Sequence, residues 1–153
     1  MPSLDDVYRK FGEASEAAQL LETELGNILL MVDAVDQNLI KQPDEKTATA
    51  LYNSINRQTL GQLFKSLKTS SESVDHLEEM LVRALKARNR LAHSFYRQHN
   101  FRRNSEDGHA KMLKDLEQIH NDLLEAYKAV MRLSGVDLDK IVLDRLPTGH
   151  VPI

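Results

Sequence analysis

The apolar residues of the first forty positions recur every three or four residues. This spacing runs from about Leu4 to Ile40 and places the apolar side chains on one face of a helix. They are Val7, Phe11, Ala14, Ala18, Leu21, Leu25, Ile28, Leu29, Val32, Val35 and Leu39. The spacing does not hold a strict heptad, so it predicts a helix that packs into a core rather than a coiled-coil rod.

Local signals bound this first helix. Ser3 stands before two acidic residues and is expected to cap the helix start. Pro43 cannot continue a helix and ends the segment. Gly26 indicates a bend or a close helix contact, and a break near Gly12 is a second option.

Two more helical patterns follow. Residues 45–67 show a shorter pattern, which predicts one turn-broken helix or two short helices that change between Asn56 and Thr59. Thr69 to Glu72 has the form of a capping box and is expected to open the next helix. That helix is predicted to run to about His99, before a polar connection from Asn100 to Gly108.

A last helix is predicted from about His109 to Leu133, with Gly135 just beyond its end. No segment reads as a strand. The chain is therefore expected to be all-α: a four-helix bundle in one domain, residues 1–146, with a short or turn-broken second helix and a loose tail at 147–153.

Composition excludes several classes of function. Hydrophobic residues make up 41% and charged residues 28% of the 153 positions, as in an ordinary globular domain. The chain has no cysteine, hence no disulfide and no thiolate metal site. It lacks an apolar run of about 18 residues, and its acidic start is unlike a signal peptide. We expect a cytoplasmic protein that makes no membrane contact. The net charge of −3 means that any nucleic acid must be bound by a local patch.

The stretch from Ala87 to His99 concentrates polar chemistry. At about 100° per residue, Arg88 falls at the centre of the apolar face of its helix. Asn89, His93 and Arg97 follow at intervals of four and should form one ridge on the opposite side. Arg88 has two interpretations. Its stem could lie along the core while its head reaches water or a carboxylate, or its guanidinium could face a cleft or interface and bind phosphate.

The sequence Arg88-Asn89-Arg90-Leu91-Ala92-His93 resembles the R-polar-x(3)-H signature of the HEPN-domain family. The resemblance implies a small four-helix bundle that pairs into a homodimer at the motif. Many members are metal-independent ribonucleases, often toxins or antiviral defence proteins. Toxins paired with a nucleotidyltransferase antitoxin typically carry His-x-Tyr after the motif. Here the tyrosine, Tyr96, lies one position further on.

The resemblance implies that Arg88 and His93 are catalytic. RNA supplies its own nucleophile, the 2′-hydroxyl, so cleavage would leave a 2′,3′-cyclic phosphate and need neither metal nor cofactor. The residues expected to bind the RNA are Asn89, Arg90, Tyr96, Arg97, His99, Arg102 and Arg103. Tyr96 and Phe101 could stack on bases, and Phe101 could instead be core. The basic residues would also stabilise a helix C-terminus without any ligand.

The spacing raises a geometric problem. Five residues place Arg88 and His93 about 140° apart on a regular helix. Arginine's reach, a helix distortion or a second chain could bring them into one site, and the family resemblance favours a homodimer. An antitoxin or regulatory protein would be a further partner. Two alternatives stay open: a non-catalytic HEPN-like protein that binds RNA, a nucleotide or a protein, and an unrelated helical interaction protein.

Overall fold

The computed structural model describes residues 1–70, 77–141 and 147–150, and these residues form helices and short connections, with no strand among them. The expectation of an all-α protein is confirmed. In chain order the elements are α1 (Leu4–Asp36), α2 (Glu45–Asn56), α3 (Leu60–Ser70), α4 (Glu78–His93), α5 (Phe95–His99), the 3-10 helix η2 (Asn100–Asn104), α6 (Glu106–Leu133) and the 3-10 helix η3 (Leu138–Lys140).

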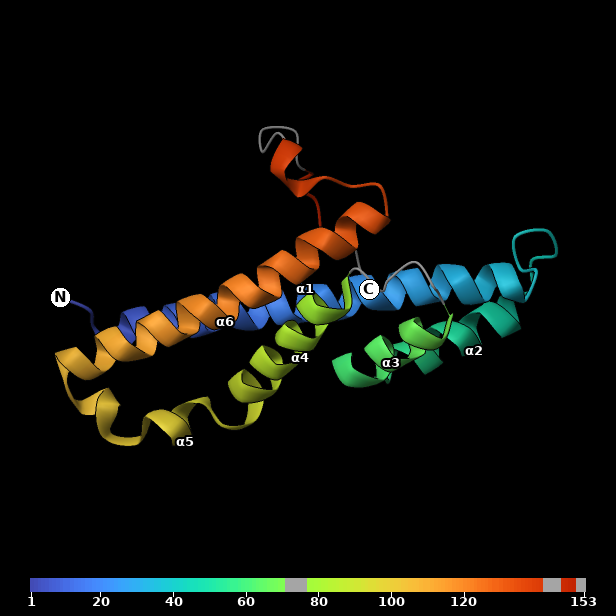
Figure 1. Cartoon of the computed structure of the whole chain (residues 1–153). Helices are drawn as coiled ribbons and strands as arrows, with labels where there is room; N and C mark the ends of the chain where they lie inside the picture. Colours follow the sequence, from blue (N-terminus) through green and yellow to red (C-terminus); the bar gives the residue numbers. More distant parts are fainter. Residues whose placement is uncertain (71–76, 142–146, 151–153) are drawn as a thin grey trace.

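Helix α1 is the longest element and packs against most of the others (Figure 1). Helix α6 runs parallel to it. His109, near the start of α6, lies beside Pro2, and Ser134 bonds Glu24. Helix α4 packs mainly on α6, while α2 and α3 pack on the C-terminal half of α1 (Figure 1). The molecule is thus a three-helix core of α1, α4 and α6, with two short helices added at one end.

The ends of α1 follow from local hydrogen bonds. The Ser3 hydroxyl accepts from the Asp6 backbone N–H, and the Asp6 carboxylate accepts from the Ser3 N–H, which confirms the predicted cap. The helix ends at Asp36, before the predicted Ile40, because Asn38 adopts a left-handed conformation with φ 58°. The helix continues through Gly12 without a break.

Gly26 marks a close helix contact, one of its two predicted roles. A Cβ atom at this position would lie 3.2 Å from Cγ2 of Ile55 in α2. The missing side chain lets α2 approach α1 at this point.

The region after α1 forms two short helices, α2 and α3, which confirms the second of the two predicted arrangements. Asp44 caps α2 by accepting from the Lys46 N–H. Thr59 and Gln62 exchange backbone-to-side-chain hydrogen bonds at the start of α3. The predicted capping box at Thr69 to Glu72 does not open α4, because α3 continues to Ser70. Ser71 and Glu72 lie outside the described residues, and α4 begins at Glu78.

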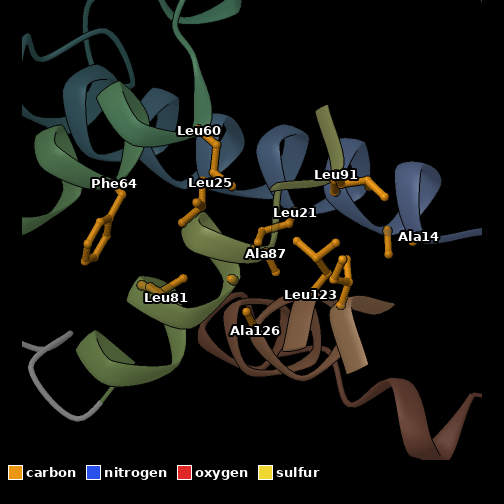
Figure 2. Packing of buried hydrophobic residues seen from close by; sticks show 14 of the residues in the cluster. Ala14, Leu21, Leu25, Leu60, Phe64, Leu81, Ala87, Leu91, Leu123 and Ala126 are labelled. Carbon is orange, nitrogen blue, oxygen red and sulfur yellow. The ribbon is translucent and has the colours of Figure 1, made fainter. Parts of the chain in front are cut away.

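The core lies where α1, α4 and α6 meet, and it continues toward α3 (Figure 2). Its labelled members include Leu21 and Leu25 of α1, Leu60 and Phe64 of α3, Leu81, Ala87 and Leu91 of α4, and Leu123 and Ala126 of α6. Fully burying a side chain such as Leu21 contributes about 1.5–3 kcal/mol. This cluster holds α4, the helix that carries the motif, against both long helices.

Helix α6 begins three residues earlier than predicted. The Ser105 hydroxyl caps it by accepting from the Gly108 N–H at 3.1 Å. After α6, Lys128 and Arg132 bind the Asp139 carboxylate and hold η3 on the helix end. Residues 142–146, at the end of the predicted domain, and residues 151–153 of the predicted loose tail at 147–153 lie outside the described residues.

Candidate functional site

The helix that carries the motif ends at His93, not at about His99 as predicted. Ser94 has φ −140° and ψ −8°, and a separate short helix, α5, starts at Phe95. The break lets Phe95 turn into the core, where it is 1% exposed and packs on Phe11 and His99. Burial of a phenylalanine outweighs the loss of helical regularity at one serine. The predicted ridge of Asn89, His93 and Arg97 is therefore interrupted.

Arg88 lies in a groove of about 340 Å³ between α1 and α4. Its Nε donates to Glu22 Oε1 at 3.0 Å and its Nη1 donates to Asn89 Oδ1 at 3.3 Å. The side chain is 24% exposed. The head of Arg88 meets a carboxylate, as the first interpretation expects, and it also lies in a groove, as the second requires. Binding of phosphate by Arg88 stays a prediction.

The walls of this groove are partly apolar. Phe11 and Ala18 of α1 face Leu91 and Ala92 of α4 across it. Ala92 is exposed, although its helix packs on the core. A groove of this composition offers a surface that another chain or a ligand could cover.

His93 is exposed at the last position of α4 and does not line the groove that holds Arg88. This agrees with the angle of about 140° expected for a five-residue separation on a regular helix. Within the described ranges, no hydrogen bond joins the two side chains. One chain therefore leaves the two predicted catalytic groups on different parts of its surface.

Three of the predicted RNA contacts belong to one internal network around Asp115 of α6. Arg90 forms a bidentate pair with this carboxylate, Nη1 to Oδ1 at 3.0 Å and Nη2 to Oδ2 at 2.6 Å. His99 Nε2 lies 2.7 Å from Oδ2, and His99 Nδ1 lies 3.1 Å from Arg102 Nη1. A guanidinium can only donate, so Nδ1 accepts, and Nε2 donates to Asp115.

This Asp115 network ties together four elements. Arg90 on α4 also donates from Nε to Gln98 Oε1 on α5, at 3.0 Å. His99 ends α5, Arg102 lies in η2, and Asp115 lies on α6. The network spans the break at Ser94 and fixes the angle between α4 and α5. Arg90, His99 and Arg102 therefore stabilise the fold.

Charge and burial act in opposite directions on Asp115. Burial raises the pKa of its carboxyl, but the hydrogen bonds from Arg90 and His99 outweigh burial and hold the pKa below its ordinary value. The same hydrogen bond raises the pKa of the Arg90 guanidinium. The pair is ionised at neutral pH.

The sequence reasoning missed Asp115, although a signal was present. Asp115 lies three residues after Met112 and four before Ile119, both buried, so it borders the apolar face of α6. A carboxylate in that position faces the neighbouring helix and needs a cation or hydrogen-bond donor there, because an unpaired buried charge is costly.

The aromatic residues near the motif form a cluster of tilted rings from α1 and α5. The ring of Tyr96 lies 5.1 Å from Phe11 and 6.3 Å from Tyr8, centroid to centroid. Burial, then the neighbouring Tyr8, raises the pKa of the Tyr96 hydroxyl. Arg103 donates to the Tyr8 hydroxyl at 3.3 Å. Tyr96 is 39% exposed and can still meet a ligand with one face.

The remaining predicted contacts lie at the surface. Asn89 and Arg97 are exposed. Phe101 is 77% exposed, so the alternative that placed it in the core is wrong. Side chains from the parts of the chain that the structure describes form no group of three or more His, Asp or Glu able to hold a metal ion. None of the described helices has both the length and the apolar character of a membrane-crossing segment.

Comparison with known proteins gives no relative. No protein-family model, no curated protein and no solved structure matches the chain.

Proposed function

We propose that this chain is a metal-independent endoribonuclease of the HEPN type, active as a homodimer. The observation that carries the proposal is the position of Arg88. It comes from the apolar face of its helix, yet its guanidinium lies in an open groove instead of in the core. The resemblance assigns the catalytic roles to Arg88 and His93.

Cleavage of RNA through its 2′-hydroxyl requires one fixed cation and one group that transfers a proton. The Nη2 group of Arg88 makes no hydrogen bond within the described residues, so it is available to a phosphate oxygen, while Glu22 and Asn89 orient the guanidinium. An imidazole can take or give a proton near neutral pH. His93 would assist at the 2′-hydroxyl or the leaving 5′-oxygen, and Arg88 would stabilise the charge that develops on phosphorus.

A second copy of the chain would complete the site. His93 and Arg88 face different directions in one chain, but a two-fold interface brings each group of one copy toward the other group of its partner. The partly apolar groove walls and the exposed faces of Tyr8 and Tyr96 offer apolar area to such an interface.

The first experiment is incubation of the purified protein with a mixed RNA pool in EDTA. Wild type should leave 2′,3′-cyclic phosphate ends, and Arg88→Ala and His93→Ala should each lower the rate by about 10²–10⁴-fold. Arg83→Ala on the same helix is the matched control, because its ion pair to Glu125 is long (3.9 Å) and exposed. Circular dichroism checks that each variant is folded. Cleavage that survives His93→Ala would refute the assigned role.

Mixing the two inactive variants tests the shared site. If Arg88 and His93 of one site come from different chains, random pairing restores about a quarter of the wild-type sites. If both come from one chain, mixing restores nothing. Full activity at concentrations where the protein is monomeric by light scattering would refute the homodimer.

Growth provides a check in cells. A ribonuclease used as a toxin or in defence should arrest growth on overexpression, and His93→Ala should relieve the arrest. RNA binding without cleavage would instead favour the non-catalytic binding protein. The Glu22–Arg88 ion pair is the observation that supports this alternative, because a charge that is already paired can serve binding and stability alone.

A further inference from the structure

A cleft of about 800 Å³ opens between α1 and the α2–α3 pair. Its volume falls in the range of small-ligand sites. Its α1 residues lie between Gln19 and Asn27, in the middle of that helix. Helices α2 and α3, which supply the other wall, pack on α1 from this region onward (Figure 1). None of the residues named in the HEPN-like motif lines it.

The cleft is lined mainly by neutral hydrogen-bonding groups. Four amide side chains come from three parts of the chain: Gln19 and Asn27 from α1, Asn56 from the end of α2, and Gln58 from the α2–α3 connection. Each amide carries both donors and an acceptor. Tyr52 adds an aromatic ring that is 43% exposed, and buried Ile55 and Leu63 form an apolar floor.

This chemistry fits a planar heterocycle better than a phosphate. The edge of a nucleobase presents donors and acceptors side by side, which amides can pair, and its face stacks on an aromatic ring. A phosphate would need cations, and the charged group in the cleft lining is the carboxylate of Glu22.

The cleft adjoins the groove that holds Arg88. Gln19 and Glu22 line both. Glu22 also accepts from Arg88 Nε at 3.0 Å, so the proposed phosphate-binding cation lies next to a residue that lines the cleft. From Gln19 to Asn27 the cleft follows about 12 Å of α1.

We infer that this cleft holds one unpaired nucleobase of a single-stranded RNA whose neighbouring phosphate is bound by Arg88. The inference rests on the proposed function for its ligand class, and it gives the site a source of base preference. Tyr52 stacks on the base, and Asn56 pairs with its edge.

Fluorescence anisotropy with labelled five-nucleotide RNAs tests this. The probes are oligo-U, oligo-A, oligo-C and an abasic ribose-phosphate of the same length, bound to the full-length His93→Ala variant so that no probe is cleaved. At least one base-bearing probe should bind about tenfold or more tighter than the abasic one.

Variants then locate the source of that preference. Tyr52→Ala should remove most of the preference, by a factor of about ten, and Asn56→Ala a smaller part, while affinity for the abasic probe stays unchanged. Asn53→Ala is the matched control, because Asn53 is exposed on the same helix but does not line this cleft. Arg88→Ala should weaken all four probes alike.

The outcomes separate this inference from the ribonuclease. A base preference that is lost in Tyr52→Ala, with no cleavage by wild type, would support nucleobase binding in the cleft and refute the ribonuclease function. Cleavage by wild type, with equal binding of base-bearing and abasic probes, would overturn the cleft alone. A preference that survives both Tyr52→Ala and Asn56→Ala would also overturn the cleft, and so would no binding of any probe.

Discussion

Asp115 is the carboxylate on which the polar network of the motif region depends, and Asp115→Asn tests that role. The change keeps the shape of the side chain but removes its charge. The remaining amide oxygen can still accept from Arg90 Nη1. The amide nitrogen replaces Oδ2 and faces two donors, Arg90 Nη2 and His99 Nε2.

The cost follows from burial. A hydrogen bond to a charged group contributes about 1.5–3 kcal/mol, but the Arg90 side chain is 40% exposed, so water replaces much of its loss. The His99 side chain is 3% exposed, and a buried donor without an acceptor costs about 1–3 kcal/mol. His99 could exchange its ring proton between nitrogens, but Nδ1 would then face the Arg102 guanidinium. Together these losses amount to about 2–3 kcal/mol.

Thermal and urea unfolding followed by circular dichroism measure the effect. For a chain of this size, 2–3 kcal/mol lowers Tm by about 6–9 °C. Glu125→Gln is the control, because its side chain is 61% exposed and its ion pair to Arg83 is 3.9 Å long. If Asp115→Asn and Glu125→Gln have the same Tm at pH 7, the network does not stabilise the fold and the reasoning is wrong.

The pH dependence has a definite sign. The pKa of Asp115 is lowered in the folded protein, so its contribution is complete above the ordinary value of 3.8 and is lost as the pH falls through the folded pKa. The stability gap between wild type and Asp115→Asn should therefore narrow in acid.

Two further predictions concern other parts of the fold. Gly108→Ala should destabilise the protein by about 1–3 kcal/mol in urea unfolding, because a Cβ would clash with the backbone carbonyl of Arg102, whereas Gly12→Ala, in open space, should stabilise it by about 0.5–1 kcal/mol. Equal effects would contradict the close packing of η2 on α6. Burial and then the Lys10 ammonium lower the pKa of His120 from its ordinary value of 6.5. As the pH is lowered below 6.5, the unfolded chain therefore binds a proton at this histidine before the folded chain does, and the free energy of unfolding decreases. His120→Gln should flatten that slope, and an NMR titration of His120 at or above 6.5 would contradict it.

Local chemistry made part of this structure predictable. The Ser3 cap and the interruption between Asn56 and Thr59 depend on residues within one or two turns of each other, and both were predicted. The break at Ser94 was not, since neither proline nor glycine marks it. It depends on Phe95 reaching a core that α1 and α6 complete.

In the candidate site too, local sequence predicted some features, while others depend on partners that are distant in sequence. The prediction that Arg88 would sit at the centre of an apolar face came from helical periodicity, but its partner Glu22 is 66 residues away in sequence. Arg90 and His99 were predicted to bind RNA because basic residues clustered around a motif. Their partner, Asp115, lies on another helix, and only the fold brings the three together.

The central place of α1 has a consequence for synthesis of the protein. The N-terminal half of this helix is covered by α6, which is complete only at Leu133, 97 residues after α1 ends at Asp36. At typical translation rates, the ribosome needs on the order of 5–20 seconds to make that length. Helices α2 and α3 can cover their half of α1 much earlier. Until then the apolar face around Val7 and Ala14 lacks the largest part of its cover. A nascent chain stalled before α6 therefore exposes apolar surface to chaperones and to nascent chains on neighbouring ribosomes.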